Sequence, residues 1–169
     1  MNYYFAYGSN MSLKRIQHRL SGVTHIGRYK LPGYKLQFHK AGDDGSAKCD
    51  AFKTNNSANH IYGALFKVPS EEIQKLDEIE GVGSGYIRTN VMIMDDVDGK
   101  LLEASTYIAT KINNNLLPFS WYFNHVYQGA IENQLPEQYI QENILCVTSI
   151  EDVDQDRDRR EREVYLNLL

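Results

Sequence analysis

Short extended segments broken by turn residues dominate the first 110 residues of the chain. Aromatic and β-branched side chains gather in short runs, and Gly, Pro, Asn and Asp separate them, a pattern typical of strands joined by loops. We expect strands over residues 3–7, 25–40, 47–54, 60–68, 86–96 and 100–110, with a break at 31–33 and a hairpin between the last two. We expect helices over residues 11–20, 68–81, 118–134 and 136–147. Because strands and helices do not alternate regularly, this order favours an α+β fold, in which a curved, mostly antiparallel sheet or small barrel carries helices on its outside.

The size and charge of the chain limit the partners it can bind. Its 169 residues suffice for one domain, which we expect to span residues 1–150. A net charge of −4 and scattered Lys and Arg residues argue against nucleic acid as a partner. The first residues lack the basic and apolar regions of a signal peptide, and no run approaches the roughly 18 apolar residues of a membrane span. We therefore expect a cytoplasmic protein with no membrane partner.

The C-terminal tail, residues 151–169, is strongly charged, with acids and arginines mixed along it. Asp156 precedes Arg160 by four residues, and Asp158 precedes Arg162 by four, which is the spacing of ion pairs on one helix face. We expect this tail to be a solvated helix without a part in the function.

The two cysteines do not have the spacing of metal ligands. Cys49 and Cys146 both lie in apolar surroundings, and we expect both to be ordinary buried thiols. The five histidines are dispersed, with no pair at helical spacing. We therefore expect neither a metal site nor a cofactor.

An aromatic strand runs directly into Gly8, Ser9 and Asn10 near the N-terminus. Glycine accepts a positive φ, and such a turn could direct the backbone N–H groups of Ser9, Asn10 and Met11 toward an anion at the start of the following helix. A carboxylate would suit such a site. Alternatively, this is a simple strand-to-helix turn, in which Asn10 or Ser12 caps the helix. The turn taken alone favours this second interpretation.

The segment over residues 68–81 is the clearest helix in the sequence. We expect Ser70 to be its N-cap and Gly81 to end it. Its apolar stripe is expected to comprise Ile73, Leu76 and Ile79.

Glu80 lies beside this stripe in the last turn of the helix, where it can face a cleft. A negative charge at the C-terminal end of a helix opposes the helix dipole, so this position suggests a functional role. Asp77 and Glu78 are expected to point further from the core. The alternative is that Glu80 is an exposed acid at a helix end.

Two motifs in order resemble those of a known family. YFAYGSNM, residues 4–11, is followed by LDEIEGVGSGYIR, residues 76–88. Together they resemble the γ-glutamylcyclotransferase family, whose members begin with a Tyr-Gly-Ser-Asn loop and later carry a helix that ends in Glu-Gly. The resemblance extends from about Tyr3 to about Leu145.

This resemblance implies a small mixed, mostly antiparallel β-barrel with flanking α-helices and a cavity at the barrel mouth. It implies that Glu80 is the catalytic acid and base, and it also suggests a homodimer. The residues that it implies for substrate binding are Tyr7, Gly8, Ser9, Asn10, Met11, Tyr86 and Tyr122. For the last two a role as ordinary core aromatics stays open.

The predicted activity is conversion of a γ-glutamyl amino acid or γ-glutamyl amine to 5-oxoproline and the free amine. The free α-amine would attack the γ-carbonyl of the same molecule, and glutathione is one candidate substrate. The alternative is a binding module of the same fold that recognises a carboxylate ligand without turnover. The negative charge of Glu80 counts against this alternative.

Overall fold

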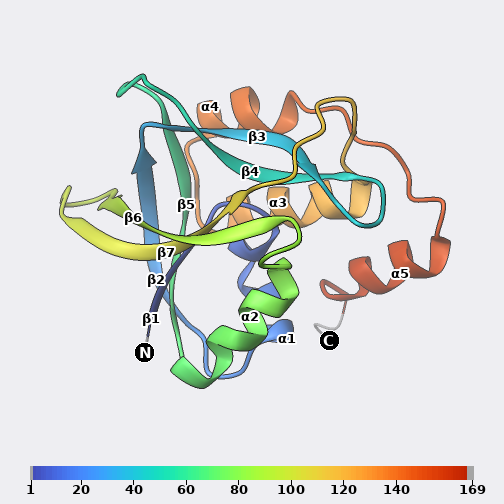
Figure 1. Cartoon of the computed structure of the whole chain (residues 1–169), viewed down its shortest axis with the longest axis horizontal. Coiled ribbons are helices and arrows are strands. Elements are labelled where there is room, and N and C mark those ends of the chain that lie inside the picture. The colour runs from blue at the N-terminus through green and yellow to red at the C-terminus, as the bar shows by residue number, and fades with distance from the viewer. Residues whose placement is uncertain (1, 167–169) are drawn as a thin grey trace.

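The centre of the computed structural model, which describes residues 2–166, is a closed barrel of five strands (Figure 1). In barrel order these are β1 (Asn2–Ala6), β5 (His60–Val68), β2 (Thr24–Pro32), β6 (Tyr86–Asp95) and β7 (Leu101–Ala109). The barrel closes through a parallel pairing of β1 with β7, and the other pairings are antiparallel. The predicted mixed, mostly antiparallel barrel with flanking helices is therefore confirmed.

A separate hairpin crosses one end of the barrel (Figure 1). It comprises β3 (Tyr34–Ala41) and β4 (Ala47–Lys53). The predicted break at 31–33 is present, and there Gly33 has a φ of 79° that turns the chain out of the barrel. The side chain of Asp50 accepts the N–H of Ala109 at 2.8 Å, which attaches the hairpin to the end of β7.

Helices surround the barrel. They are α1 (Leu13–Arg19), α2 (Ile73–Glu80), α3 (Ser120–Glu132), α4 (Glu137–Ile140) and α5 (Gln155–Glu163). Short 3-10 turns at Ser9–Met11 and Ser70–Glu72 precede α1 and α2, and a π-helical turn at Gln141–Leu145 follows α4. None of the helices within residues 2–166 is both long and apolar enough to cross a membrane.

Three expectations about these helices need correction. Ser70 is not an N-cap, because Pro69 occupies that position and Ser70 is itself the first residue of the 3-10 turn. The expected apolar stripe of α2 is narrower than predicted, since Leu76 is buried whereas Ile79 is exposed. The helix expected over 136–147 is α-helical only as far as Ile140, and its continuation is π-helical. Gly81, with a φ of 70°, ends α2 as predicted.

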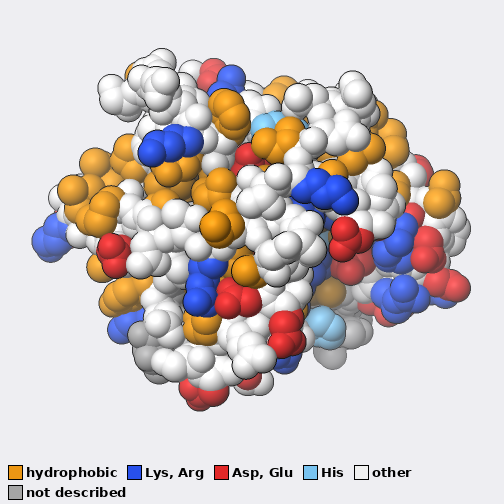
Figure 2. All heavy atoms as spheres, viewed as in Figure 1, with side chains coloured by type: hydrophobic (Ala, Val, Ile, Leu, Met, Phe, Trp, Pro, Cys, Tyr) orange, Lys and Arg blue, Asp and Glu red, His pale blue; other side chains and the backbone are white. Residues whose placement is uncertain are grey.

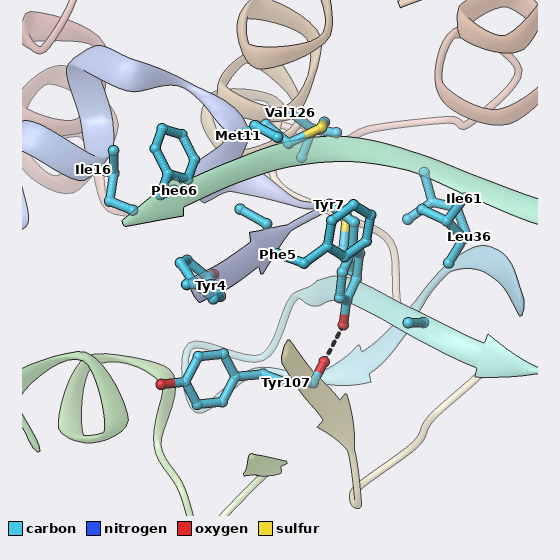
Figure 3. Packing of buried hydrophobic residues seen from close by; sticks show 14 of the residues in the cluster. Tyr4, Phe5, Tyr7, Met11, Ile16, Leu36, Ile61, Phe66, Tyr107 and Val126 are labelled. Carbon is cyan, nitrogen blue, oxygen red and sulfur yellow. Dashed lines mark hydrogen bonds between the residues drawn. The ribbon is translucent and has the colours of Figure 1, made fainter. Parts of the chain in front are cut away.

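The core fills the barrel and the space between the barrel and α3 (Figure 3). Phe5 and Phe66 are fully buried on the paired strands β1 and β5, and Met11 lies beside Val126 of α3. Cys49 is buried, as expected. Cys146 is exposed, contrary to expectation, because the chain leaves the core after the π-helical turn.

Gly129 allows α3 to lie directly against the turn that follows β1. A Cβ atom on Gly129 would stand 2.6 Å from both the Cβ of Met11 and the backbone nitrogen of Ser12. No side chain fits at these distances without moving the backbone, so Gly129 fixes the distance between α3 and the turn.

We predict that Gly129→Ala destabilises the protein although alanine is the better helix former. In an exposed helix this substitution would stabilise by about 1 kcal/mol. Here overpacking is expected to lower the free energy of unfolding by about 1–3 kcal/mol, measured by urea denaturation. Ile131→Ala, at a half-exposed position of the same helix, serves as the control and should have a much smaller effect. Equal stability of Gly129→Ala and wild type would show that α3 and the turn at Met11 and Ser12 are not tightly packed.

Candidate active site

The turn after β1 forms one wall of the site. Ser9–Met11 make a 3-10 turn closed by a hydrogen bond from the Met11 N–H to the Gly8 carbonyl at 3.0 Å. Ser12 then caps α1 by accepting the N–H of Arg15. Of the two predicted candidates for this cap, Ser12 is therefore the residue used.

Gly8 does not have the expected positive φ; its φ is −112°. A glycine is needed there for space instead. A Cβ on Gly8 would lie 3.0 Å from the Cβ of Cys49 and 3.3 Å from the hydroxyl of Tyr122. The turn therefore sits directly against the β3–β4 hairpin and α3.

The turn has two N–H groups available to a ligand rather than three. The Met11 N–H is used within the turn. Within residues 2–166, the N–H groups of Ser9 and Asn10 have no protein acceptor. Ser9 and Asn10 are both buried, so an anion that accepts these two hydrogen bonds would satisfy donors shielded from bulk water.

Glu80, the last residue of α2, reaches this turn. The Asn10 side chain donates a hydrogen bond to Glu80 Oε1 at 2.7 Å. Arg19 of α1 donates to the Asn10 side-chain oxygen at 3.0 Å, and its guanidinium lies 4.0 Å from Glu80 Oε1. Asn10 therefore occupies a position between a cation and an anion, and its orientation is fixed by both.

The surroundings of Glu80 oppose its ionisation. The side chain is 16% exposed, and burial raises the pKa of Glu80 above its ordinary value of 4.5. The positive charges of Arg19 and Arg15 and the hydrogen bond from Asn10 offset part of this effect. A carboxyl group with a raised pKa can both accept and return a proton more readily near neutral pH.

Five tyrosines enclose the space in front of Glu80: Tyr4, Tyr7, Tyr86, Tyr107 and Tyr122. Three of them donate their hydroxyl hydrogen to the protein. Tyr7 donates to the carbonyl of Tyr107 (Figure 3), Tyr86 donates to the carbonyl of Cys49, and Tyr107 donates to the side chain of Asp77.

The other two tyrosines accept hydrogen bonds. The Tyr4 hydroxyl accepts from the Asn10 side chain at 3.3 Å, and the Tyr122 hydroxyl accepts from the Cys49 N–H at 2.9 Å. Burial raises the pKa of Tyr4 and of Tyr122 well above the ordinary value, so both keep their hydrogen at neutral pH. Tyr4 and Tyr122 therefore bring hydroxyl donors to the pocket.

These residues line a narrow inner pocket with a volume of about 30 Å³. Its complete lining is Tyr4, Tyr7, Gly8, Ser9, Asn10, Cys49, Glu80, Tyr86, Tyr107 and Tyr122. An outer pocket of about 330 Å³ adjoins it, because Ser9, Glu80, Tyr86 and Tyr122 line both.

The structure brings together all but one of the residues expected at the site. Met11 is the exception. Its side chain is fully buried, and the Asn133 side chain of the loop after α3 donates to its carbonyl at 3.0 Å. Sequence reasoning did not select Tyr4, Cys49 or Tyr107, which also line the pocket. Nothing in their spacing distinguishes them from other strand residues, since only the closure of the barrel brings β1 and β7 together.

Asp77 is more exposed than Glu80, as expected, with 25% of its side chain accessible against 16%, and it does not line the inner pocket. It accepts hydrogen bonds from the hydroxyl of Tyr107 and from Arg88, both at 2.8 Å. Glu78 is exposed, as expected. Because Asp77 is held by the rim of the barrel, Glu80 one turn later faces the pocket.

Cys49 is a poor candidate for a nucleophile although it lines the pocket. Burial raises the pKa of its thiol to about 12, so the reactive thiolate is scarce at neutral pH.

No cluster of three or more potential metal-ligating His, Cys, Asp or Glu side chains occurs in the described part of the chain.

Comparison with known proteins finds one matching family model and several similar proteins. Residues 60–142 match the model of the AIG2-like family. The human protein named gamma-glutamylcyclotransferase is 29% identical over 148 residues, which is 85% of this chain and 77% of the relative. The mouse protein of the same name is 28% identical over 147 residues. A solved structure named gamma-glutamyl cyclotransferase superposes with a TM-score of 0.82 at 24% identity, covering 96% of this chain and 98% of the other.

The chain is therefore similar to the AIG2-like family over residues 60–142, and to proteins named gamma-glutamylcyclotransferase over most of its length. The segment that matches the AIG2-like model includes Glu80, Tyr86 and Tyr122, whereas the turn at Ser9–Met11 lies outside it. The superposition with the solved structure covers nearly the whole chain and confirms the fold that the resemblance implied.

The charged tail is held more firmly than its sequence predicts. The expected pair of Asp158 with Arg162 forms at 2.9 Å, but Asp156 pairs with Arg159 rather than with Arg160. Glu161 of α5 lines the outer pocket.

Glu161 forms an ion pair with Arg15 and a hydrogen bond with His125 of α3. Burial lowers the pKa of His125 to about 4, although its hydrogen bond with Glu161 opposes this effect. Helix α5 therefore contributes one residue to the lining of the outer pocket, while none of its residues is buried; residues 167–169 of the tail lie outside the described part of the chain.

The raised pKa of Glu80 leads to a prediction about stability. A carboxyl group whose pKa is higher in the folded than in the unfolded state binds more protons when folded, so stability falls as the pH rises through this range. Glu80→Gln removes this penalty. We expect the free energy of unfolding of the variant, relative to wild type, to increase as the pH rises from below 4.5, by about 1.4 kcal/mol for each unit by which the pKa is raised.

Urea denaturation at a series of pH values measures this difference. Glu71→Gln is the control, because Glu71 is exposed in the turn that precedes α2 and its substitution should give no comparable trend. A relative stability of Glu80→Gln that falls as the pH rises would show that the folded state favours the ionised carboxylate.

Proposed function

We propose that this protein is a γ-glutamylcyclotransferase, which converts a γ-glutamyl amino acid or γ-glutamyl amine to 5-oxoproline and the free amine. The observation that supports this most directly is that a largely buried carboxylate, Glu80, lines the same pocket as Ser9 and Asn10, whose backbone N–H groups have no protein acceptor among the described residues. The similarity to known proteins agrees with this activity, because the human and mouse relatives are named for it.

The N–H groups of Ser9 and Asn10 would receive the α-carboxylate of the glutamyl group. Both are donors without a protein acceptor among the described residues. Arg19 lies close by and adds positive charge. Fixing the carboxylate at this turn orients the neighbouring α-amine toward Glu80.

Glu80 would carry the protons that the reaction moves. The α-amine is an ammonium at neutral pH, so it must lose a proton before its nitrogen can attack the γ-carbonyl carbon. The neutral amine still holds two hydrogens, and the lactam nitrogen of 5-oxoproline keeps one of them. Glu80 would accept the other as the new C–N bond forms and donate it to the departing nitrogen as the old C–N bond breaks. The proton that the ammonium loses before attack is balanced by the proton that the released amine takes up at neutral pH, so neither water nor a net proton is consumed.

Besides moving protons, the site would hold the amine and the γ-carbonyl group of the substrate in the geometry for attack. Nucleophile and carbonyl belong to one molecule, so folding the substrate into attack geometry replaces a bimolecular encounter. The Tyr4 hydroxyl accepts from Asn10 and keeps its hydrogen for donation to the oxygen that becomes negative during attack. The inner pocket has room for only part of the glutamyl group, so the leaving amine would lie in the outer pocket.

Incubation with γ-glutamyl-alanine tests this proposal. We expect equal amounts of 5-oxoproline and alanine, detected by mass spectrometry. Glu80→Gln should lower the rate by about 10²- to 10⁴-fold, because it removes the acid and base. Glu71→Gln should leave the rate unchanged.

Formation of glutamate instead of 5-oxoproline would show hydrolysis and would contradict the proposal. If γ-glutamyl-alanine, γ-glutamyl-lysine and glutathione all stay intact, a carboxylate-binding module becomes the better explanation. An active Glu80→Gln variant would exclude Glu80 as the proton carrier.

A further inference from the structure

Lys40, on β3, is a buried cation at the edge of the site. The residue is 7% exposed and lines the outer pocket. Its ammonium lies 4.8 Å from the centre of the Tyr86 ring, and Tyr86 lines both pockets. Lys40 therefore contacts Tyr86, a residue that lines the inner pocket, from the side of the outer pocket.

Lys40 differs from the other three cations that line the outer pocket. Arg15 pairs with Glu161, Lys48 pairs with Asp44 at 2.7 Å, and Arg19 lies near Glu80. For the ammonium of Lys40, residues 2–166 provide no carboxylate partner and no hydrogen bond.

A buried charge without a counter-ion is costly, and contact with one aromatic face compensates only in part. Arg15, Lys48 and Arg19 each have a carboxylate of the protein within 4.0 Å. Lys40 has none among the described residues, so it is the cation best placed to bind an incoming anion. Acidic and basic side chains are mixed over this part of the surface, beside the β3–β4 turn and α5 (Figure 2).

Gly85 makes room for this ammonium. A Cβ on Gly85 would lie 2.6 Å from Cε of Lys40 and 2.7 Å from its Nζ. Both atoms belong to the end of a flexible side chain, so alanine at position 85 would displace the Lys40 ammonium rather than the backbone. The loop between α2 and β6 is therefore in direct reach of this ammonium.

We propose that Lys40 is a specificity-determining residue of the site: it binds the carboxylate of the leaving group, and through this contact it distinguishes γ-glutamyl amino acids from γ-glutamyl amines that lack that carboxylate. This inference rests on the proposed function, which places the leaving group in the outer pocket. The α-carboxylate of the glutamyl group is held by the turn at Ser9 and Asn10, so a second carboxylate on the leaving group is the anion left for Lys40.

The outer pocket also contains acids that could attract a cationic amine. Asp43 and Glu78 line it, but both are exposed. Solvent and salt screen exposed charges far more than buried ones. Lys40 should therefore determine the preference more strongly than Asp43 and Glu78.

Two substrates that differ by one carboxylate test the proposal. γ-Glutamyl-alanine and γ-glutamyl-ethylamide release alanine and ethylamine respectively, and are otherwise alike. We expect wild type to favour γ-glutamyl-alanine by about tenfold to a hundredfold in kcat/KM, the range of one charge-assisted hydrogen bond. Lys40→Met, which keeps the length of the side chain, should reduce this ratio to near one, because kcat/KM falls more for γ-glutamyl-alanine than for γ-glutamyl-ethylamide.

The ratio separates recognition from chemistry. Loss of the Lys40 charge also alters the electrostatic surroundings of Glu80, but that effect applies to both substrates and cancels in the ratio. Lys111→Met, an exposed position outside the pocket with the same change in charge, is the control and should keep the wild-type ratio. Gly85→Ala keeps the Lys40 charge but displaces it, and should lower the ratio in part.

Each outcome is decisive. If wild type converts both substrates at similar kcat/KM, or prefers γ-glutamyl-lysine linked through its side-chain amine, the assignment to Lys40 is wrong while the proposed function stands. If Lys40→Met slows both substrates equally, Lys40 acts on the shared glutamyl part and the inference is overturned. If wild type converts no γ-glutamyl compound, the proposed function itself fails.

Discussion

The hydrogen bond between Asn10 and Glu80 joins two parts of the chain that are 70 residues apart in sequence. Asn10 belongs to the turn that follows β1, and Glu80 is the last residue of α2. This contact brings the free N–H groups of the turn and the buried carboxylate to the same pocket. Without it, the turn would be an ordinary helix start and Glu80 an acid at an unfavourable helix end.

The fold maintains this contact by close packing on both sides of the turn. Gly129 of α3 lets Met11 approach on one side, and Gly8 lets the hairpin residue Cys49 approach on the other. A Cβ atom on Gly129 would clash with the backbone of Met11 and Ser12, and one on Gly8 would stand 3.0 Å from the Cβ of Cys49, so close packing on both sides fixes the position of the turn. A site that must hold a small substrate in attack geometry benefits from such rigidity.

Much of the fold could be predicted from the sequence, because strands and turn residues leave local patterns. The break at Gly33, the hairpin of β6 and β7, and the end of α2 at Gly81 all follow from such patterns. The closure of the barrel could not be derived in the same way, since the parallel pairing of β1 with β7 joins segments that are distant in sequence.

The errors also have physical reasons. Cys146 was expected to be buried because its neighbours are apolar, but the chain turns outward after the π-helical turn. Gly8 was assigned a positive φ from its type alone, whereas the need for glycine comes from Cys49 and Tyr122 across the pocket.

The same limit applies to the cations of the outer pocket. The sequence shows Lys40 and Lys48 as two similar residues near a turn, yet Asp44 neutralises only Lys48. Local charge patterns identify ion pairs within one element, such as Asp158 and Arg162 of α5. They do not show which cation is left without a partner, because that depends on contacts between separate elements.

The measurement that tests the central claim most directly is an NMR titration of the side-chain carboxyl carbon of Glu80. The resonance can be assigned by comparison of ¹³C-glutamate-labelled wild type with Glu80→Gln. The structure predicts a midpoint above the ordinary pKa of 4.5, because burial outweighs the nearby positive charges. A midpoint at or below 4.5 would contradict the account, since Glu80 would then be an ordinary salt-bridged acid rather than a carboxyl group prepared for proton transfer.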